Sequence, residues 1–210
     1  MKRSVNKSKT SNKKAGTGPG ILVVLSAPSG CGKTSIVERL LKRHPDWVRS
    51  ISATTRNPRV DEKDAQDYFF LSRENFEQKA REGKMLEHAE IYGNLYGTPR
   101  QFVADQVAQG KTVIMTIDVQ GTKQIVASWG KERPLLSVFV LPPSVKALRE
   151  RLTGRNTETP EEIEKRIEIA QDEIKAANLY NHTVINQNLD QAVLEVEEII
   201  LNVSKQSSPC

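Results

Sequence analysis

Short apolar runs alternate along the chain with segments whose apolar residues recur every three or four positions. Residues 21–26 (ILVVLS) form the first run, and similar runs occupy residues 112–117, 135–141 and, more briefly, 183–185. Continuous apolar runs of this length, rich in β-branched residues, are typical of strands buried on both faces of a parallel sheet. We therefore expect these segments to be strands of one parallel sheet.

The segments between the runs have the spacing of amphipathic helices. Helices are predicted to begin at Lys33, near residue 101, and after Ser144, Thr159 and Asn188. Thr159 is followed by proline and, three residues on, by an acid, which is the pattern of a capping box. The apolar positions on these helices are Ile36, Val37, Leu40, Leu41, Phe102, Val103, Val107, Val145, Leu148, Ile163, Ile167, Ala170, Ile174, Ala177, Ala192, Val193, Val196 and Ile200.

This alternation predicts an α/β fold whose parallel-sheet core is covered by helices on both faces. Two segments do not fit the alternation. Residues 53–98 are polar and aromatic with several turn signals, which indicates an inserted, small α+β lobe; residues 151–169 concentrate arginine and indicate a mobile lid. The core is therefore expected to comprise residues 21–52 and 99–205, in one domain of residues 21–205.

Residues 27–34 (APSGCGKT) join the first strand to the first helix and have the spacing of a phosphate-binding loop. Glycines allow backbone N–H groups to turn toward a phosphate, Lys33 can reach the β- and γ-phosphates, and Thr34 can join a Mg²⁺ shell. The first position is alanine instead of the usual glycine, and the alternative is a glycine-rich turn that binds nothing. The residues expected to bind ATP here are Ala27, Pro28, Ser29, Gly30, Cys31, Gly32, Lys33 and Thr34.

The net charge of +5 is concentrated at the N-terminus. Residues 1–20 hold six basic residues and no acid, which leaves 25 basic and 26 acidic residues in the rest of the chain. The nearly neutral remainder argues against a nucleic-acid surface. The tail is polar and is predicted to be disordered, with a transit peptide as the alternative, and no secretory signal is apparent.

Membrane spans and disulfides are not expected, because no apolar run is long enough to cross a bilayer and the two cysteines, Cys31 and Cys210, lie far apart in sequence. We expect a cytoplasmic protein. Cys31 lies next to a predicted helix N-terminus, which lowers a thiol pKa, so it is either a reactive thiol or a small filler residue.

Four ordered motifs resemble those of the guanylate kinase family. The first, residues 54–70, matches T-[ST]-R-x-x-[KR]-x-x-[DE]-x-x-[GA]-x-x-Y-x-[FY] at Thr54, Thr55, Arg56, Arg59, Glu62, Ala65, Tyr68 and Phe70. The others are residues 87–98 (EHAEIYGNLYGT), 117–121 (IDVQG) and 151–159 (RLTGRNTET). The resemblance covers nearly all of residues 21–201.

The resemblance implies an enzyme that transfers the γ-phosphoryl group of ATP to GMP, and to dGMP, with Mg²⁺ as cofactor. Its implied GMP-binding residues are Ser52, Arg56, Arg59, Tyr68, Glu87, Tyr96, Thr98 and Asp118. It further implies that Arg151 and Asn186 bind ATP. The residues implied to stabilise the transferring phosphoryl group are Lys33, Arg59, Arg155 and Arg166, while Thr34 joins the metal shell.

The chemistry of guanine agrees with these roles. A carboxylate on Glu87 can accept hydrogen bonds from N1–H and the N2 amine, whereas adenine presents a lone pair at N1 and no N2 amine. Ser52 and Thr98 are expected to donate to O6. Judged alone, Glu87 could be a solvated helix-end acid, the arginines a salt-bridged surface and Asn186 a turn residue. The nucleophile is an anionic phosphate oxygen, so no general base is needed, and the three histidines are expected to be structural.

Two other readings of the chain stay open. Some guanylate-kinase-like domains bind phosphoproteins and catalyse nothing, and a related kinase could act on AMP, UMP or TMP. Thr116 stands where the family commonly has an acid, which could lower metal affinity or turnover. The expected partners are the small-molecule substrates, without nucleic acid or membrane, and the sequence leaves monomer or homo-oligomer undecided.

Overall fold

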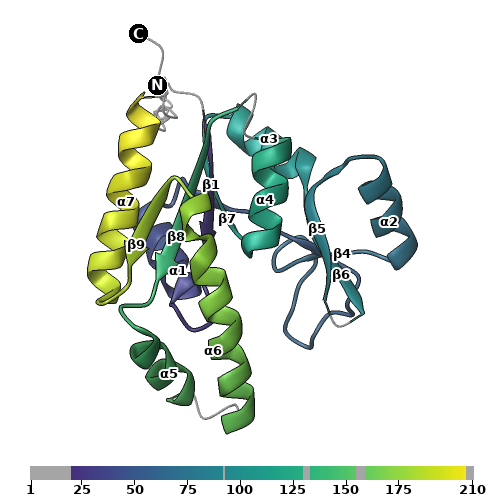
Figure 1. Cartoon of the computed structure of the whole chain (residues 1–210). Helices are drawn as coiled ribbons and strands as arrows, with labels where there is room; N and C mark the ends of the chain where they lie inside the picture. The colour runs from purple at the N-terminus through teal and green to yellow at the C-terminus, as the bar shows by residue number, and fades with distance from the viewer. Residues whose placement is uncertain (1–19, 92, 130–132, 155–158, 207–210) are drawn as a thin grey trace, which may run out of the picture.

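The computed structural model describes residues 20–91, 93–129, 133–154 and 159–206, and it contains a five-stranded parallel sheet. The strands lie in the order β2 (Val48–Arg49), β7 (Thr112–Thr116), β1 (Ile21–Ser26), β8 (Leu135–Leu141) and β9 (His182–Ile185) (Figure 1). The four predicted strands are confirmed within one residue at each end. The pattern missed β2, because two residues are too few to show a periodicity.

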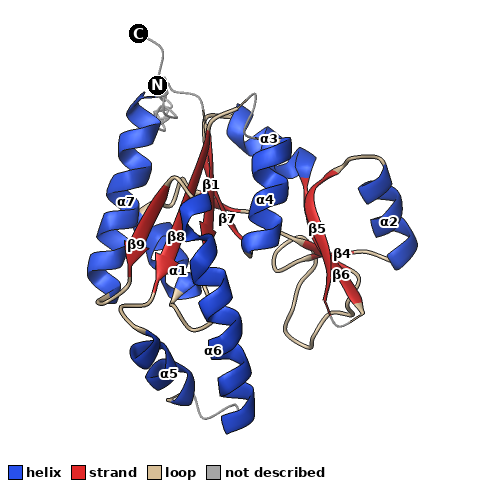
Figure 2. Ribbon diagram, in the orientation of Figure 1, coloured by secondary structure: helices blue, strands red, loops and turns tan. Residues whose placement is uncertain are grey.

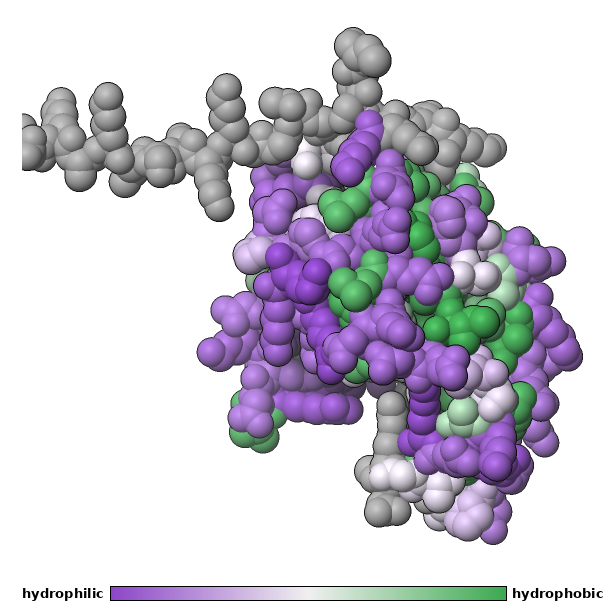
Figure 3. Space-filling model, turned by 90° about the vertical axis from the view of Figure 1, so that its left-hand side faces the viewer, coloured by the Kyte–Doolittle hydropathy of each residue, from purple (hydrophilic) through white to green (hydrophobic). Residues whose placement is uncertain are grey.

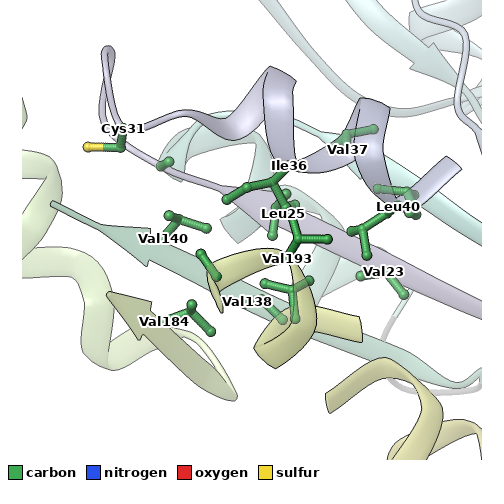
Figure 4. Packing of buried hydrophobic residues seen from close by; sticks show 14 of the residues in the cluster. Val23, Leu25, Cys31, Ile36, Val37, Leu40, Val138, Val140, Val184 and Val193 are labelled. Atoms are coloured by element: carbon green, nitrogen blue, oxygen red, sulfur yellow. The ribbon is translucent and has the colours of Figure 1, made fainter. Parts of the chain in front are cut away.

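Alternate residues of the central strand β1 face opposite sides of the sheet. Ile21, Val23 and Leu25 pack in one cluster with residues of α1 (Lys33–Arg43) and α7 (Leu189–Gln206), as Figure 4 shows for part of that cluster. Leu22 and Val24 pack on the other side with residues of α3 (Arg100–Ala108) and α4 (Val119–Ser128). The predicted two-sided burial is therefore confirmed, although the sequence pattern did not identify α4.

Polar side chains cap the helices where the sequence predicted them. Ser144 Oγ accepts a hydrogen bond from the N–H of Ala147 at the start of α5 (Val145–Thr153). At α6 (Pro160–Lys175), Thr159 and Glu162 form the reciprocal capping box. Such caps satisfy N–H groups that have no partner in the first turn, and each contributes about 1 kcal/mol.

Some of the apolar positions expected to be buried are not. Val145 is 36% exposed because it is the first residue of α5, where the helix has not yet reached the core. Ile174 is only partly buried, and Ala177 lies beyond α6 in the short 3₁₀ helix η1 (Ala176–Leu179). The stripe of α6 therefore faces the core from Ile163 to Ala170 and then turns away.

A second sheet lies beside the core, within the segment expected to form an inserted lobe (Figure 2). Its strands lie in the order β4 (Phe69–Phe70), β3 (Ala53–Thr54), β6 (Asn94–Pro99) and β5 (Met85–Ile91), and α2 (Arg73–Arg81) joins β4 to β5. The lobe has its own small cluster of buried apolar residues, which includes Phe76. The predicted tail lies outside the described residues except for Gly20, as does the part of the expected lid at residues 155–158.

The outer face formed around α7 and β9 is mostly hydrophilic, with smaller hydrophobic areas among the charged side chains (Figure 3). Exposed apolar residues on these elements include Ile185 and Leu194. None of the described helices is long and apolar enough to cross a membrane.

Ala65 adopts a left-handed backbone conformation, with a φ of 58°, and is the one described non-glycine residue with a positive φ. Its N–H donates to the carbonyl of Tyr68, so the turn requires this conformation. A Cβ disfavours it by roughly 1–2 kcal/mol, while glycine loses about 0.4–1 kcal/mol through the entropy of the unfolded chain. Ala65→Gly should therefore raise the free energy of unfolding by about 0.5–1 kcal/mol.

Urea unfolding followed by circular dichroism measures this change. Ala127→Gly is the matched control, since Ala127 lies in α4 with helical backbone, where glycine should destabilise by about 0.5–1 kcal/mol. Equal destabilisation by both substitutions would contradict the prediction.

Candidate active site

The loop between β1 and α1 leaves a free helix N-terminus at the carboxyl edge of the central sheet. Gly32 is the N-cap of α1 and has no side chain to cap the helix, so the first N–H groups are available to an anion. Gly30 and Gly32 have positive φ values of 89° and 84°. Ala27 is not among the residues with positive φ, so the alanine that replaces the usual first glycine fits without backbone strain.

Both glycines are also required by close packing. A Cβ on Gly30 would lie 2.9 Å from Leu152 Cδ2, and one on Gly32 would lie 2.6 Å from Asn186 Nδ2. Asn186 donates from Nδ2 to the carbonyl of Cys31, while its buried Oδ1 has no hydrogen-bond partner. The residue after β9 therefore holds the loop in shape.

A first cavity of about 660 Å³ opens over this loop. It is lined by Ala27, Pro28, Ser29, Gly30, Gly32, Lys33, Thr34, Ser35, Ile91, Asp118, Arg166, Ile169 and Glu173. Most of the predicted ATP-binding loop thus faces one space. Cys31, by contrast, is fully buried beneath the loop and does not line the cavity.

A second cavity of about 320 Å³ lies between the core and the lobe. Its lining residues are Lys33, Ser52, Tyr68, Glu87, Ala89, Ile91, Tyr96, Gly97, Thr116, Ile117 and Asp118. Five of the predicted GMP-binding residues are therefore brought together, and Lys33, Ile91 and Asp118 line both cavities. The two spaces meet at Lys33 and Asp118.

Glu87 is a buried carboxylate in the second cavity, only 8% exposed. It lies on β5, not at the end of a helix. Thr98 Oγ1 donates to Glu87 Oε1 over 2.8 Å. Burial raises the pKa of Glu87, the hydrogen bond from Thr98 lowers it, and the nearby Asp118 raises it.

The expected contact between Thr98 and a guanine O6 does not agree with this geometry. Thr98 is fully buried, does not line the cavity, and has already given its one hydroxyl proton to Glu87. Its position instead orients the carboxylate. Ser52 does line the cavity, and its contact with the base stays a prediction.

Lys33 is partly removed from solvent, and two acidic residues, Asp118 and Glu173, lie near it. Burial lowers the pKa of Lys33, while Glu173 and Asp118 raise it. Asp118 caps α4 by accepting from the N–H of Gly121 over 2.8 Å. Burial raises the pKa of Glu173, and Lys33 lowers it. The net effect lowers the pKa of Lys33, because burial outweighs the two carboxylates. Neither carboxylate bonds the lysine directly among the described hydrogen bonds.

Glu173 was missed by the sequence analysis. It lies on α6 seven residues after Arg166, and both line the first cavity. A separation of seven residues places two side chains on one helix face, so this polar pair beside the apolar stripe was the available signal. The sequence does not show that Lys33 of α1 lies near Glu173, so from sequence alone Glu173 cannot be told from an ordinary solvent-exposed acid on a helix.

The expected lid arginines have different partners. Arg166 Nη1 donates to Ser29 Oγ over 2.7 Å, which connects α6 to the phosphate loop. Arg151 Nη2 donates to the carbonyl of Asn186 over 2.7 Å, near the same loop. Arg155 lies outside the described residues, so its role stays a prediction.

The arginines of the lobe do not line either cavity. Arg56 Nη2 donates to both carboxylate oxygens of Glu62, at 2.8 and 2.9 Å, and the guanidinium lies 5.6 Å from the centre of the Tyr68 ring. Arg59 is exposed, and its backbone N–H also donates to Glu62. Tyr68 contacts Tyr96 edge to face, and both tyrosines line the second cavity.

The three histidines lie away from both cavities. His44 stacks on Trp47 and hydrogen-bonds Glu197, far from the cavities in the packing of α1 against α7. His88 and His182 are exposed. Among the described residues, no histidine lines either cavity.

A strand, a phosphate loop and a helix at the carboxyl edge of a parallel sheet define a P-loop nucleotide-binding protein. A family model described as guanylate kinase matches residues 20–203. The chain is 48% identical over 181 residues to a guanylate kinase of Synechocystis sp., across 86% of this chain and 93% of that relative. It is 45% identical over 184 residues to one of Clostridium perfringens, across 87% and 83%.

The structures agree with the sequences. The crystal structure of guanylate kinase from Anaplasma phagocytophilum matches with a TM-score of 0.69 and 29% sequence identity, and the match covers 90% of this chain and 88% of that one. The chain belongs to the guanylate kinase family.

Burial decides between the two interpretations of Cys31. The residue has no exposed surface, and burial raises the pKa of its thiol to about 11, an effect that Arg151 and Lys33 only partly offset. A rise from the ordinary 9.0 lowers the thiolate fraction at neutral pH about hundredfold. The geometry favours the filler residue over the reactive thiol.

We expect iodoacetamide at pH 8 to label Cys31 at least about a hundredfold more slowly in the folded protein than in urea, because the reagent needs an exposed thiolate. Labelling in the Cys210→Ser variant, followed by mass spectrometry, reports Cys31 alone. Rapid labelling that bound ATP suppresses would restore the reactive-thiol interpretation.

Proposed function

We propose that the first cavity binds ATP, the second binds GMP, and the γ-phosphoryl group passes between them beside Lys33. As a guanylate kinase, the chain is a phosphotransferase that uses ATP to phosphorylate GMP. The observation that carries the site assignment is that Lys33, Ile91 and Asp118 line both cavities. A donor and an acceptor held on either side of Lys33 would therefore meet at one cation.

The first cavity suits a triphosphate. The open N-terminus of α1 and the inward-facing loop offer N–H donors, and Lys33 and Arg166 offer positive charge. A Mg²⁺ ion fits the same space, because Thr34, Asp118 and Glu173 present oxygen donors to it. Mg²⁺ binds few protein ligands and keeps waters and phosphate oxygens, and when bound it neutralises charge on the phosphates.

The second cavity suits a guanine base. The carboxylate of Glu87 has one oxygen bonded by Thr98 and can accept from both N1–H and the N2 amine. Ser52 lines the same cavity and would donate to O6. An adenine would leave this buried carboxylate against a lone pair, which costs roughly 10⁴-fold or more in discrimination. AMP and the pyrimidine monophosphates are therefore poor substrates in this proposal, and dGMP, which keeps the base, is a good one.

The GMP phosphate would lie near Tyr68 and Tyr96, in reach of the lobe arginines. Arg56 is held beside Tyr68 by Glu62, so a phosphate would compete with that carboxylate for the guanidinium. Arg59 is exposed and would have to turn inward as the lobe approaches the core. Bidentate pairing with phosphate stabilises that arrangement.

The transfer itself needs positioning and positive charge more than acid–base chemistry. An oxygen of the GMP phosphate is already anionic and would attack the γ-phosphorus of ATP directly. The bond from that phosphorus to the β,γ-bridging oxygen breaks, and ADP leaves with the bonding electron pair. Lys33 would stabilise charge that develops between the two phosphates, with Arg166 from α6 and Arg155 from the expected lid. Closure of the lid and lobe would exclude water, which otherwise hydrolyses ATP.

The alternative of a silent interaction module lacks support, because the phosphate loop has its glycine conformations and its lysine in a cavity with Arg166. A coupled assay of ADP formation from ATP with GMP, dGMP, AMP, UMP and TMP separates the remaining substrates. The absence of a nucleic-acid or membrane partner and a cytoplasmic location stay expectations from composition.

Glu87→Gln should lower kcat/KM for GMP, with a loss of transition-state stabilisation of about 3–5 kcal/mol. The reason is that a charge-assisted hydrogen bond is lost and an amide donor faces a guanine donor. The KM for ATP should hardly change, since Glu87 does not line the first cavity. Activity on AMP should rise to a detectable level, because the amide can donate to adenine N1.

Steady-state kinetics with GMP, AMP and ATP varied separately test these statements. Glu90→Gln is the matched control, being the same substitution at an exposed position of the same strand. An unchanged kcat/KM for GMP in Glu87→Gln would mean that Glu87 does not read the base.

Thr98→Val should reveal the orienting role of Thr98. Loss of its hydrogen bond to a charged group should cost about 1.5 kcal/mol, or about tenfold in kcat/KM for GMP. A protonated Glu87 cannot accept both guanine donors, so GMP affinity falls as the pH drops through the raised pKa of Glu87. Since the Thr98 hydrogen bond lowers that pKa, the variant should lose affinity at a higher pH than the wild type.

The pH profile of the KM for GMP measures the shift, and the titration of GMP itself is common to both proteins. Thr112→Val, at the far end of β7, is the control. A parallel loss at every pH, without displacement of the profile, would contradict the role given to Thr98.

A further inference from the structure

A chain of buried hydroxyl groups lies behind the proposed active site. Tyr180 donates from its hydroxyl to Thr122 Oγ1 over 3.0 Å, and Thr122 Oγ1 donates to the carbonyl of Asp118 over 2.8 Å. Ser26 Oγ lies 3.1 Å from Thr122 Oγ1 and donates to the carbonyl of Ile117 over 2.5 Å. Ser26, Thr122 and Tyr180 are all at least nine-tenths buried, and none lines either cavity.

The elements joined by this chain are those that carry the proposed catalytic groups. Ser26 ends β1 and directly precedes the phosphate loop. Ile117 and Asp118 lie between β7 and α4, and Asp118 lines both cavities. Tyr180 follows η1, which continues α6 with Arg166 and Glu173, and its ring packs 4.8 Å from that of Phe139.

The directions of the hydrogen bonds follow from counting protons. Three hydroxyl groups have one proton each. With the Tyr180 proton on Thr122 Oγ1, Thr122 can satisfy the carbonyl of Asp118 and Ser26 can satisfy that of Ile117. Without the Tyr180 hydroxyl, Ser26 can turn its proton to Thr122 instead, which leaves the carbonyl of Ile117 without it.

We propose that Tyr180 is a positioning residue whose hydroxyl holds Asp118 and the start of the phosphate loop in register with α6. The inference rests on the proposed roles of the phosphate loop and Asp118. Tyr180 lines neither cavity, so it would act on the site through Thr122 and Ser26. Buried networks of this kind are worth more than one hydrogen bond, because each bond orients the next.

Tyr180→Phe keeps the ring and removes only the hydroxyl. We expect kcat with ATP and GMP to fall about tenfold, as small displacements of reacting groups have large effects on rate, while both KM values stay within about twofold. Ile200→Val is the control for lost stability, since Ile200 is fully buried on α7 in a cluster with α1. It should lower the melting temperature comparably and leave kcat unchanged.

A double-mutant cycle identifies the route. In a Thr122→Val background the further substitution of Tyr180 should change kcat less than twofold, because the hydroxyl has lost its acceptor. An additive loss, or a kcat for Tyr180→Phe no lower than that of Ile200→Val, would overturn the proposal.

Amide chemical shifts give a test that does not depend on activity. In Tyr180→Phe, the N–H resonances of Gly121 and Thr122, which bond Asp118, should shift together with those of the phosphate-loop glycines. Unchanged shifts at these amides would also overturn the proposal. A wild-type protein without ATP-dependent GMP phosphorylation would count against the proposed function alone, and the amide shifts would still decide the role of Tyr180.

Discussion

Lys33 lies where the two cavities meet, in surroundings that both disfavour and require its charge. Burial lowers its pKa, and the two nearby carboxylates, Asp118 and Glu173, raise it. A cation that is partly removed from water is costly unless opposite charge compensates it, so these acids offset part of the cost of placing a lysine there. Neither acid forms a hydrogen bond or ion pair with Lys33 among the described contacts, so the ammonium group can still bind a phosphate. Phosphate groups that enter the cavities would take over this compensation.

The loop that presents Lys33 depends on packing from elements distant in sequence. Leu152 of α5 lies against Gly30, and Asn186, after β9, lies against Gly32. A methyl group at either glycine would collide with these side chains and would also disfavour the left-handed backbone. The phosphate loop is thus fixed from beneath by the C-terminal half of the chain, and Cys31 is the small residue that fits this contact.

Two charged groups of the lobe each have a hydrogen-bonding partner. Glu62 retains Arg56, and Thr98 orients Glu87, so neither the guanidinium nor the carboxylate is left without a partner. Such pairs limit the cost of burying charge before a substrate arrives, and they set each side chain in one conformation. The carboxylate of Glu87 already lies in the second cavity, whereas Arg56 and Arg59 do not line it.

The sequence determined what depends on neighbours a few residues away. Strand runs, helix caps such as Thr159 with Glu162, and the glycine loop before Lys33 involve local hydrogen bonds and periodic burial. Motif spacing predicted Glu87 as the acid that reads the base. Tertiary structure decided which distant groups meet. Thr98 donates to Glu87 across a strand pair, Tyr180 bonds Thr122 at a separation of 58 residues, and Ser26 bonds Ile117 at one of 91. Glu173 and Cys31 follow the same rule, since a charge or a thiol acquires its pKa from whatever the fold packs around it. No spacing along the chain encodes those surroundings, because they exist only once the sheet and its helices have closed around them.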